Sequence, residues 1–226
     1  MIQSSDSGLF QSSLLAGHSS VIHGFSGRAA GDMKRETGNR KIFIQNLSFR
    51  AMPLLPRQTH SARVPGDGLV SKTRPVAVFT ADCVPVLLVD PEAHVCAAVH
   101  AGWKGTLGGI TKAAVAAMVH EGACAEDIYA VIGPHIGSCC YDVLKDRADA
   151  FVRAFGPDER AAFLRGRRWF LDLGRVNYRQ IVAVGVRAHH IDLLPVCTSC
   201  QNDKFFSYRR DSRETHGEMM AVIGFI

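Results

Sequence analysis

A chain of 226 residues, 47% hydrophobic and 21% charged, is typical of one soluble globular domain with a substantial core. No apolar run reaches the roughly eighteen residues of a membrane span, and the first twenty residues lack the basic and apolar regions of a signal peptide, so we expect a cytoplasmic protein that does not bind membranes. The net charge of +5 comes from dispersed basic residues without interleaved aromatics, which argues against nucleic acid as a partner.

The apolar patterns predict strands and helices along a single domain, residues 1–226, with residues 1–20 poorly ordered. The predicted strands cover 21–25, 42–49, 76–81, 84–90, 95–100, 128–132, 168–172, 191–196 and 219–225. The predicted helices cover 105–120, 143–154 and 174–188. Because strands follow one another both through turns and through helices, we expect an α+β fold, a layered α/β sandwich with a mixed β-sheet core. No GxGxxG follows a strand and no GxxxxGK[ST] is present, which excludes dinucleotide-binding and P-loop folds.

The segment 76–106 predicts a buried hairpin with chemical groups at its open end. Its two apolar runs, 84–90 and 95–100, are separated by the turn residues 91–94. Pairing outward from this turn sets residues opposite when their numbers sum to roughly 184–186, so Cys83 falls beside His100. Such a pair is either two soft metal ligands or a nucleophile with its base.

A loop histidine, His60, would complete a two-nitrogen, one-sulfur set with Cys83 and His100. Three protein ligands and an open position are the arrangement of catalytic zinc, and thiolate with imidazole also suits copper. The alternative is structural: Cys83 packs as a small hydrophobe and His100 bonds to the backbone. The glycine-rich turn after His100, with Lys104 near a predicted helix N-terminus, is a candidate anion site beside the metal.

Five motifs follow one another along the chain: FTADCVPVLL, AAVHAGWKG, VIGPHIG, DLGRVNYRQI and FFSYRRD. Together they resemble the bacterial YfiH, or laccase-domain, family, also described as polyphenol-oxidase-like with purine nucleoside phosphorylase activity. The match runs from about residue 21 to the end of the chain. The resemblance implies an α/β sandwich related to a toxin deamidase fold, and a metal, usually zinc, on His60, Cys83 and His100.

The resemblance also implies an activity and residues that contact the substrate. Adenosine, inosine, guanosine or methylthioadenosine would be cleaved with phosphate to the base and ribose 1-phosphate, and adenosine would also be deaminated, by a monomer or homodimer. Arg28, Gln58, Lys104 and Arg209 match motif positions suited to substrate binding. Asp82, next to the proposed thiolate, is a candidate general acid or partner of a ligand, and equally a candidate for a structural salt bridge.

Three departures from the family pattern bear on the pocket. Ser61 replaces the usual glycine after the histidine, and Lys104 replaces an arginine, which keeps the charge but loses the bidentate fork. An Asn-Leu-Gly stretch is missing, because Asn39 follows Gly31 closely. We therefore expect affinity and substrate choice to differ from those of relatives.

Other functions could use the same residues. One is a Cys–His hydrolase or deamidase with Cys83 as nucleophile and His100 as base; another is a non-catalytic metal-binding module. A copper-dependent phenol oxidase is disfavoured because the ten histidines form no His-x-His pair. The nucleobase deaminase signature is absent, since His216-Gly217-Glu218 follows the cysteines instead of preceding them.

The remaining thiols have no obvious role. The count of seven is odd and no secretory signal is seen, which predicts reduced cysteines. Cys197 and Cys200 form a CxxC that suits zinc or redox chemistry, and they could join Cys139 and Cys140 in a four-cysteine site. The family pattern needs no second cysteine, so we expect these thiols to be structural or incidental.

Overall fold

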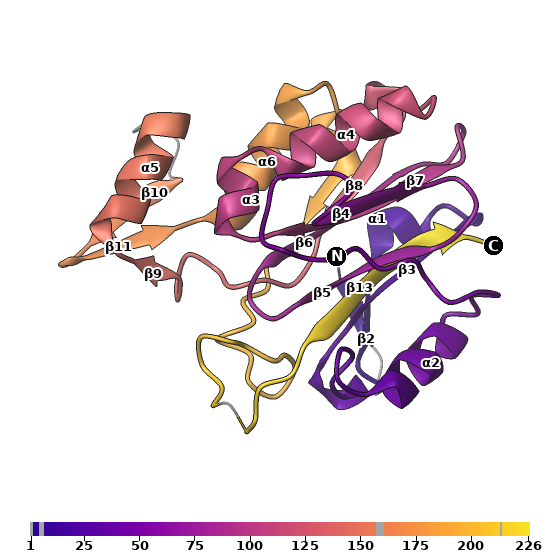
Figure 1. The fold of residues 1–226 in the computed structure, drawn as a ribbon, viewed down its shortest axis with the longest axis horizontal. Helices are drawn as coiled ribbons and strands as arrows, with labels where there is room; N and C mark the ends of the chain where they lie inside the picture. The colour runs from indigo at the N-terminus through magenta and orange to yellow at the C-terminus, as the bar shows by residue number, and fades with distance from the viewer. Residues whose placement is uncertain (1, 5–6, 157–160, 213) are drawn as a thin grey trace.

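Two five-stranded sheets pack face to face, and helices cover the outer face of each (Figure 1). The structure is a computed structural model that describes residues 2–4, 7–156, 161–212 and 214–226. Its layers run helix, sheet, sheet, helix, which confirms the predicted α/β sandwich with a mixed β-sheet core. In the described part of the chain, no helix has the length and apolar character needed to cross a membrane.

The first sheet is antiparallel and holds the C-terminal strand near its centre. In spatial order its strands are β1 (Ile2–Ser4), β2 (Leu9–Ser12), β3 (Val21–Ser26), β13 (Met219–Phe225) and β5 (Val76–Thr80). A short helix, α1 (Ser13–Ala16), follows β2 and buries Leu15 completely. Residues 9–16 are therefore part of the sandwich, although we expected little order before residue 20.

The outer face of this sheet is covered by α2 (Thr37–Asn46), where the prediction of a strand over 42–49 is wrong. The apolar run is real, but its buried members Phe43, Ile44 and Leu47 recur at helical spacing. They pack against Phe79 of the sheet, while Ile42 is 58% exposed. A short apolar run cannot distinguish strand from helix by periodicity alone.

The second sheet is mixed and carries the predicted hairpin. In spatial order its strands are β12 (Ile191–Leu193), β8 (Tyr129–Ile132), β6 (Val84–Asp90), β7 (Val95–Ala101) and β4 (Gly68–Ser71). β12 is parallel to β8, and the other neighbours are antiparallel. In the hairpin Val84 pairs with Ala101, so the paired numbers sum to 185 as predicted.

The hairpin is buried on both faces because the other sheet lies on one side and helices lie on the other. Leu87 and Val89 point toward the first sheet, whereas Val86 and Leu88 contact the helices, as alternation along a strand requires. These helices are α3 (Trp103–Leu107), α4 (Ile110–His120) and α6 (Leu173–Ala183). The single helix predicted over 105–120 divides at Gly108 and Gly109, where Gly109 has a left-handed φ of 77°.

A smaller unit projects beside α3 (Figure 1). It contains α5 (Lys145–Phe155) and a three-stranded antiparallel sheet of β10 (Ala162–Arg165), β11 (Arg168–Leu171) and β9 (Asp142–Val143). Three short 3₁₀ turns complete the described elements: η1 (Arg28–Ala30), η2 (Ala125–Asp127) and η4 (Ala188–His190). The strand β9 starts immediately after Tyr141, so this unit also forms one side of the site described next.

Candidate metal centre and cavity

The open end of the β6–β7 hairpin brings together His60, Cys83 and His100, the three residues predicted as metal ligands. Their ligand atoms all lie within 4.8 Å of one another. Cys83 immediately precedes β6, His100 lies in β7, and His60 comes from the loop between α2 and β4. The two imidazole rings are nearly perpendicular, with centroids 4.8 Å apart. Two donors are thus placed by the hairpin, and the third is delivered by a loop.

Asp67, which was not predicted as a site residue, orients the His100 ring and holds the backbone at His60. Its fully buried carboxylate accepts a 2.9 Å hydrogen bond from Nδ1 of His100. The same carboxylate accepts hydrogen bonds from the backbone N–H groups of Thr59, His60 and Ser61, which holds His60 at a positive φ of 57°. With Nδ1 of His100 engaged by Asp67, Nε2 is the ring nitrogen available to a metal beside Cys83.

The hydrogen bonds of Asp67 determine its protonation. Burial alone would raise the pKa of this carboxyl, but the hydrogen bonds from His100, Ser61 and His60 hold it well below its usual range. Asp67 is therefore an anion in the core. An ionised carboxylate behind a ligating histidine increases the basicity of that ligand.

The thiol and the imidazole at the hairpin end stabilise each other's charged forms. Burial opposes ionisation of Cys83, yet hydrogen bonds from His100 and His60 lower the pKa of its thiol to about 7. Burial likewise disfavours a charged His100, but Asp67 and Cys83 raise its pKa to about 9. A thiolate near neutral pH serves equally as a metal ligand or as a nucleophile.

The space between the three side chains suits a small cation. Gly102 borders it: a Cβ added there would lie 3.2 Å from Sγ of Cys83 and 3.3 Å from Cδ2 of His60. Tetrahedral zinc, with bonds of about 2.3 Å to sulfur and 2.0–2.1 Å to nitrogen, would place one sulfur and two nitrogens about 3.3–3.6 Å apart. The observed donors lie within 4.8 Å of one another, and their chemistry fits zinc or copper.

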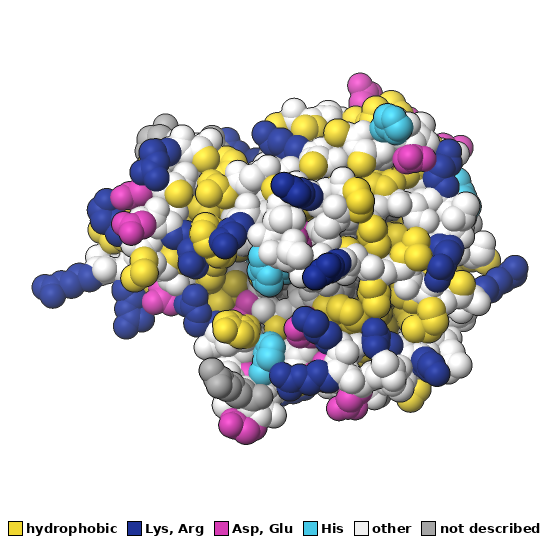
Figure 2. All heavy atoms as spheres, in the orientation of Figure 1, with side chains coloured by type: hydrophobic (Ala, Val, Ile, Leu, Met, Phe, Trp, Pro, Cys, Tyr) yellow, Lys and Arg dark blue, Asp and Glu magenta, His cyan; other side chains and the backbone are white. Residues whose placement is uncertain are grey.

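The three side chains open into a cavity of about 500 Å³. This volume is within the usual range for a small-molecule site. Figure 2 shows a hollow on this face, with histidine side chains nearby and Lys and Arg side chains around it. Besides the three donors, the cavity is lined by Lys34, Gln58, Phe79, Thr80, Ala81, Asp82, Trp103, Ile136, Tyr141, Arg147, Leu173, Tyr208, Arg209, His216 and Glu218.

Of the four residues predicted to contact substrate, two line the cavity. Gln58 does so while its side-chain amide both donates to and accepts from the backbone of Phe79. Arg209 donates a 2.6 Å hydrogen bond to Asp142 at the cavity wall. Among the described lining residues neither Arg28 nor Lys104 appears.

The side chains of Arg28 and Lys104 have other contacts. The Arg28 guanidinium forms an ion pair with Asp211 at 2.6 Å and lies over the ring of Phe206, 4.4 Å from its centroid. Lys104 is exposed on α3, and its ammonium lies 5.6 Å from the Trp103 ring centroid. The ammonium is thus near Trp103, which lines the cavity, but Lys104 itself is not among the described lining residues.

Asp82 is a cavity residue whose carboxylate already has several partners. One oxygen accepts from the Thr198 hydroxyl at 2.6 Å, and the other accepts from the Ser207 hydroxyl and from the backbone N–H of Arg209. Its φ is 83°, a left-handed conformation that is strained for aspartate. These contacts fasten the C-terminal loop beside Cys83, which is a positioning role.

Arg147 and Tyr141 were not predicted as site residues. Arg147 donates to the Tyr141 hydroxyl at 3.2 Å and stacks over Trp103, 4.3 Å from the ring centroid. Arg209 lies over the other ring, 5.3 Å from the Tyr141 centroid. Two guanidinium groups thus flank one tyrosine at the cavity. The position of Arg147 in the first turns of the predicted helix over 143–154 was the available signal, but it did not show which way the side chain points.

Comparison with known proteins gives a consistent match. A family model described as multi-copper polyphenol oxidoreductase laccase matches residues 24–226. Purine nucleoside phosphorylase YlmD of Geobacillus stearothermophilus is 42% identical over 174 residues, covering 74% of this chain and 63% of YlmD. Adenosine deaminase RL5, from an unknown prokaryotic organism, is 35% identical over 182 residues, covering 79% of this chain and 69% of RL5.

The fold is shared as well. The crystal structure of YlmD from Geobacillus stearothermophilus superposes with a TM-score of 0.87 at 29% identity, covering 99% of this chain and 98% of that one. By sequence, however, the match spans less than two thirds of YlmD.

Proposed function

Since the chain belongs to the multi-copper polyphenol oxidoreductase laccase family, as its resemblance to laccase-domain proteins predicted, we propose that it is a metal-dependent enzyme of purine nucleosides. Its reaction is phosphorolysis of adenosine, inosine, guanosine or methylthioadenosine to the free base and ribose 1-phosphate. Deamination of adenosine is a second activity of the same site. Relatives named for each of these two activities support the proposal.

The observation that carries the proposal is the meeting of three donors at one end of a nucleoside-sized cavity. His60, Cys83 and His100 leave one side of the set facing the cavity, as catalytic metal sites do. Zinc, or alternatively copper, held there would supply Lewis acidity and positive charge to the reaction. Asp67 keeps the two histidines in place while the substrate binds.

Phosphorolysis requires phosphate to be held against C1′ of the ribose. A phosphate oxygen forms the new bond to C1′ while the bond to the base breaks and its electron pair leaves with the base nitrogen. We assign the phosphate to Arg147 and Arg209, which flank Tyr141 at the cavity. Guanidinium groups bind phosphate bidentately, and charge placed in advance lowers the barrier by positioning and electrostatics.

The nucleobase has aromatic side chains available at the cavity. Trp103 and Tyr208 both line it, and Tyr208 is 75% exposed. An exposed aromatic ring at the edge of a polar cavity is suited to stacking against a purine.

The family description raises the possibility of copper-dependent phenol oxidation, which we disfavour. Reduction of oxygen by several electrons normally uses several coppers held largely by histidines. Within the described ranges, the residues that could hold a metal form only two clusters, and only the set of His60, Cys83 and His100 contains histidine.

A direct assay tests the proposed function. Purified protein is incubated with adenosine, with and without phosphate, and the products are separated by chromatography. We expect adenine and ribose 1-phosphate only when phosphate is present. We expect inosine to form from adenosine even when phosphate is absent. The proposal would be refuted if protein whose His–Cys–His site is loaded with metal formed neither of these products.

A Cys–His hydrolase is the second candidate, supported by the thiolate that His100 stabilises at Cys83 near neutral pH. Metal content distinguishes the two candidates. A thiolate that binds a metal is not a free nucleophile, so metal on Cys83 in the active protein favours the nucleoside reaction. Rapid alkylation of Cys83 in active, metal-free protein favours the hydrolase.

All seven cysteines are free thiols in the structure. We further propose that the protein is cytoplasmic, where a reducing environment would keep its cysteines reduced.

A further inference from the structure

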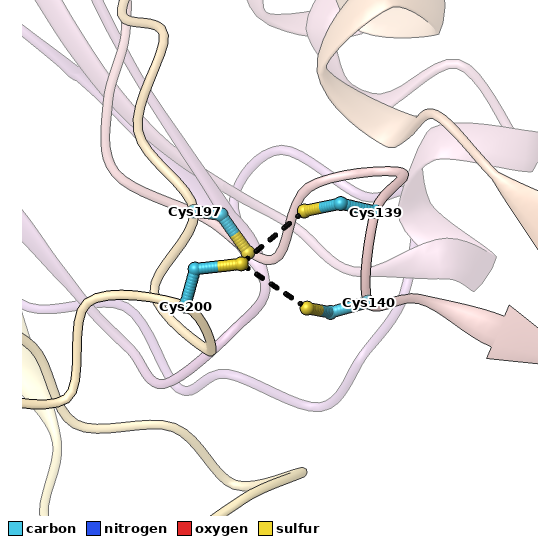
Figure 3. A group of neighbouring side chains, drawn as sticks. All are labelled: Cys139, Cys140, Cys197 and Cys200. Atoms are coloured by element: carbon cyan, nitrogen blue, oxygen red, sulfur yellow. Dashed lines mark hydrogen bonds between the residues drawn. The ribbon is translucent and has the colours of Figure 1, made fainter.

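Four of the remaining cysteines converge behind the cavity wall (Figure 3). Cys139 and Cys140 lie in the turn between β8 and β9, whereas Cys197 and Cys200 follow β12. The parallel pairing of β8 with β12 explains the meeting, because it carries the two segments to the same sheet edge. The pairing continues in a bridge between His135 and Cys197. Residues about sixty positions apart are thereby fixed side by side by the backbone.

The sulfur positions are those of ligands around a common centre. All four Sγ atoms lie within 4.8 Å of one another, and Cys200 is 3.5 Å from Cys139 and 3.3 Å from Cys140 (Figure 3). Zinc with four bonds of about 2.3 Å to sulfur places its sulfurs about 3.8 Å apart in a tetrahedron. A disulfide would instead require about 2.05 Å between two of them.

The surrounding backbone is shaped for thiolates. The N–H of Gly137 donates a 3.2 Å hydrogen bond to Sγ of Cys197. A Cβ at Gly137 would approach Sγ of Cys139 to 3.2 Å and Cβ of Cys197 to 3.3 Å, so glycine lets the two segments come this close. Four neighbouring thiols repel one another once ionised, and a divalent cation among them removes that obstacle.

From these observations we infer that Cys139, Cys140, Cys197 and Cys200 bind a zinc ion in a closed structural site, distinct from the His–Cys–His centre. The donors are all sulfur, which selects zinc over harder cations, and four protein ligands leave no position for substrate. On binding, the thiols release their protons to solvent, and no electron is transferred. We propose this site in place of the structural or incidental thiols expected from the sequence.

The site would hold two cavity-bearing segments together. Tyr141 directly follows Cys140, and Arg209 belongs to the segment that continues from Cys200. Thr198, which lies between Cys197 and Cys200, donates a hydrogen bond from its hydroxyl to Asp82, the residue before Cys83. Arg210 fixes the same turn by donating to the carbonyls of Thr198 and Ser199. Zinc would thus lock the wall that presents Tyr141 and Arg209.

Zinc stoichiometry tests the inference. We expect two zinc ions per chain in protein purified without chelator, one in Cys83→Ala and one in Cys197→Ser. Cys124→Ser is the matched control, because Cys124 is exposed and belongs to neither cluster, and it should keep both. Unchanged zinc in Cys197→Ser, or a disulfide among the four cysteines found by mass spectrometry of fresh protein, would overturn the inference.

A second measurement leaves the four cysteines intact. In Cys83→Ala the remaining zinc should show, by X-ray absorption, a shell of four sulfurs at about 2.3 Å. A shell containing nitrogen or oxygen, or no zinc at all in this folded variant, would contradict the site. Because the readout is coordination and not turnover, it is separate from the test of the proposed function.

Discussion

The carboxylate of Asp67 accepts a 2.9 Å hydrogen bond from Nδ1 of His100. It also accepts hydrogen bonds from the backbone N–H groups of three consecutive residues, Thr59, His60 and Ser61. One buried anion thus orients a histidine on a strand and a histidine on a loop. This relationship makes the candidate metal centre a prearranged site and not a chance meeting of side chains.

Replacing Asp67 should therefore weaken metal binding. Asp67→Asn removes the charge behind His100, and we expect the affinity of the His–Cys–His site to fall by about 10–100-fold, as measured by competition with a chromophoric chelator. Asp90→Asn is the matched control, since Asp90 is buried and caps a turn by accepting from Glu92 and Ala93. A similar loss of affinity in both variants would show that destabilisation, and not orientation of the ligands, is responsible.

Gly102 should tolerate no side chain at the metal centre. Its φ of −68° is accessible to alanine, so Gly102→Ala should fold, but the added Cβ would crowd Cys83 and His60. We expect loss of metal and of turnover with circular dichroism unchanged. Gly38→Ala lies in α2, where nothing is within 4 Å of the added Cβ. It should keep both its metal and its turnover and change the free energy of unfolding by at most about 1 kcal/mol. Full metal loading of Gly102→Ala would contradict the geometry described.

The pH dependence of alkylation at Cys83 follows from its hydrogen bonds. In metal-stripped protein the pKa of this thiol is lowered to about 7. A cysteine in an unfolded chain has a pKa of about 8.5, so the Cys83 thiolate persists to lower pH in the folded protein. Iodoacetamide labelling followed by peptide mass spectrometry should thus be half-maximal near pH 7. His100→Gln should move the midpoint upward, and an unchanged midpoint would exclude His100 as the stabilising partner.

Substitutions of Arg147 and Lys104 distinguish two phosphate sites: the one proposed from the structure, at Arg147 and Arg209, and the one predicted from sequence, at Lys104. Arg147→Gln should raise KM for phosphate by about 10–100-fold, the loss expected for a charge-assisted hydrogen bond of about 1.5–3 kcal/mol. Deamination, which needs no phosphate, should change much less. Lys104→Gln should leave KM for phosphate near the wild-type value, because Lys104 is exposed and does not line the cavity. A raised KM for phosphate in Lys104→Gln, with an unchanged KM in Arg147→Gln, would favour the anion site predicted at Lys104.

The parts of the site that sequence could predict are those that local rules govern. The turn length of the hairpin set its register, and the register placed Cys83 beside His100. Asp67 was not predictable in this way, because a single aspartate in a glycine-rich turn is ordinary in any protein. Its only available signal was general: a ligating histidine usually has a carboxylate behind it.

Long-range placement accounts for the remaining differences. The direction of Arg147 depends on how α5 packs beside Trp103, and the gathering of four cysteines depends on the parallel pairing of β8 with β12. Neither is encoded in nearby residues. The strand predicted over 42–49 became α2 because the sheet beneath it offers an apolar surface to one helical face.

We propose that His60, Cys83 and His100 hold the metal at which nucleosides react. The most direct test measures metal content and products from adenosine with phosphate on the same preparations of wild type, His60→Ala, Cys83→Ala and His100→Ala. We expect each variant to lose one metal ion per chain and essentially all turnover while its circular dichroism remains that of wild type. A folded variant that lacks this metal and still produces adenine or inosine at the wild-type rate would show that nucleosides do not react at this centre.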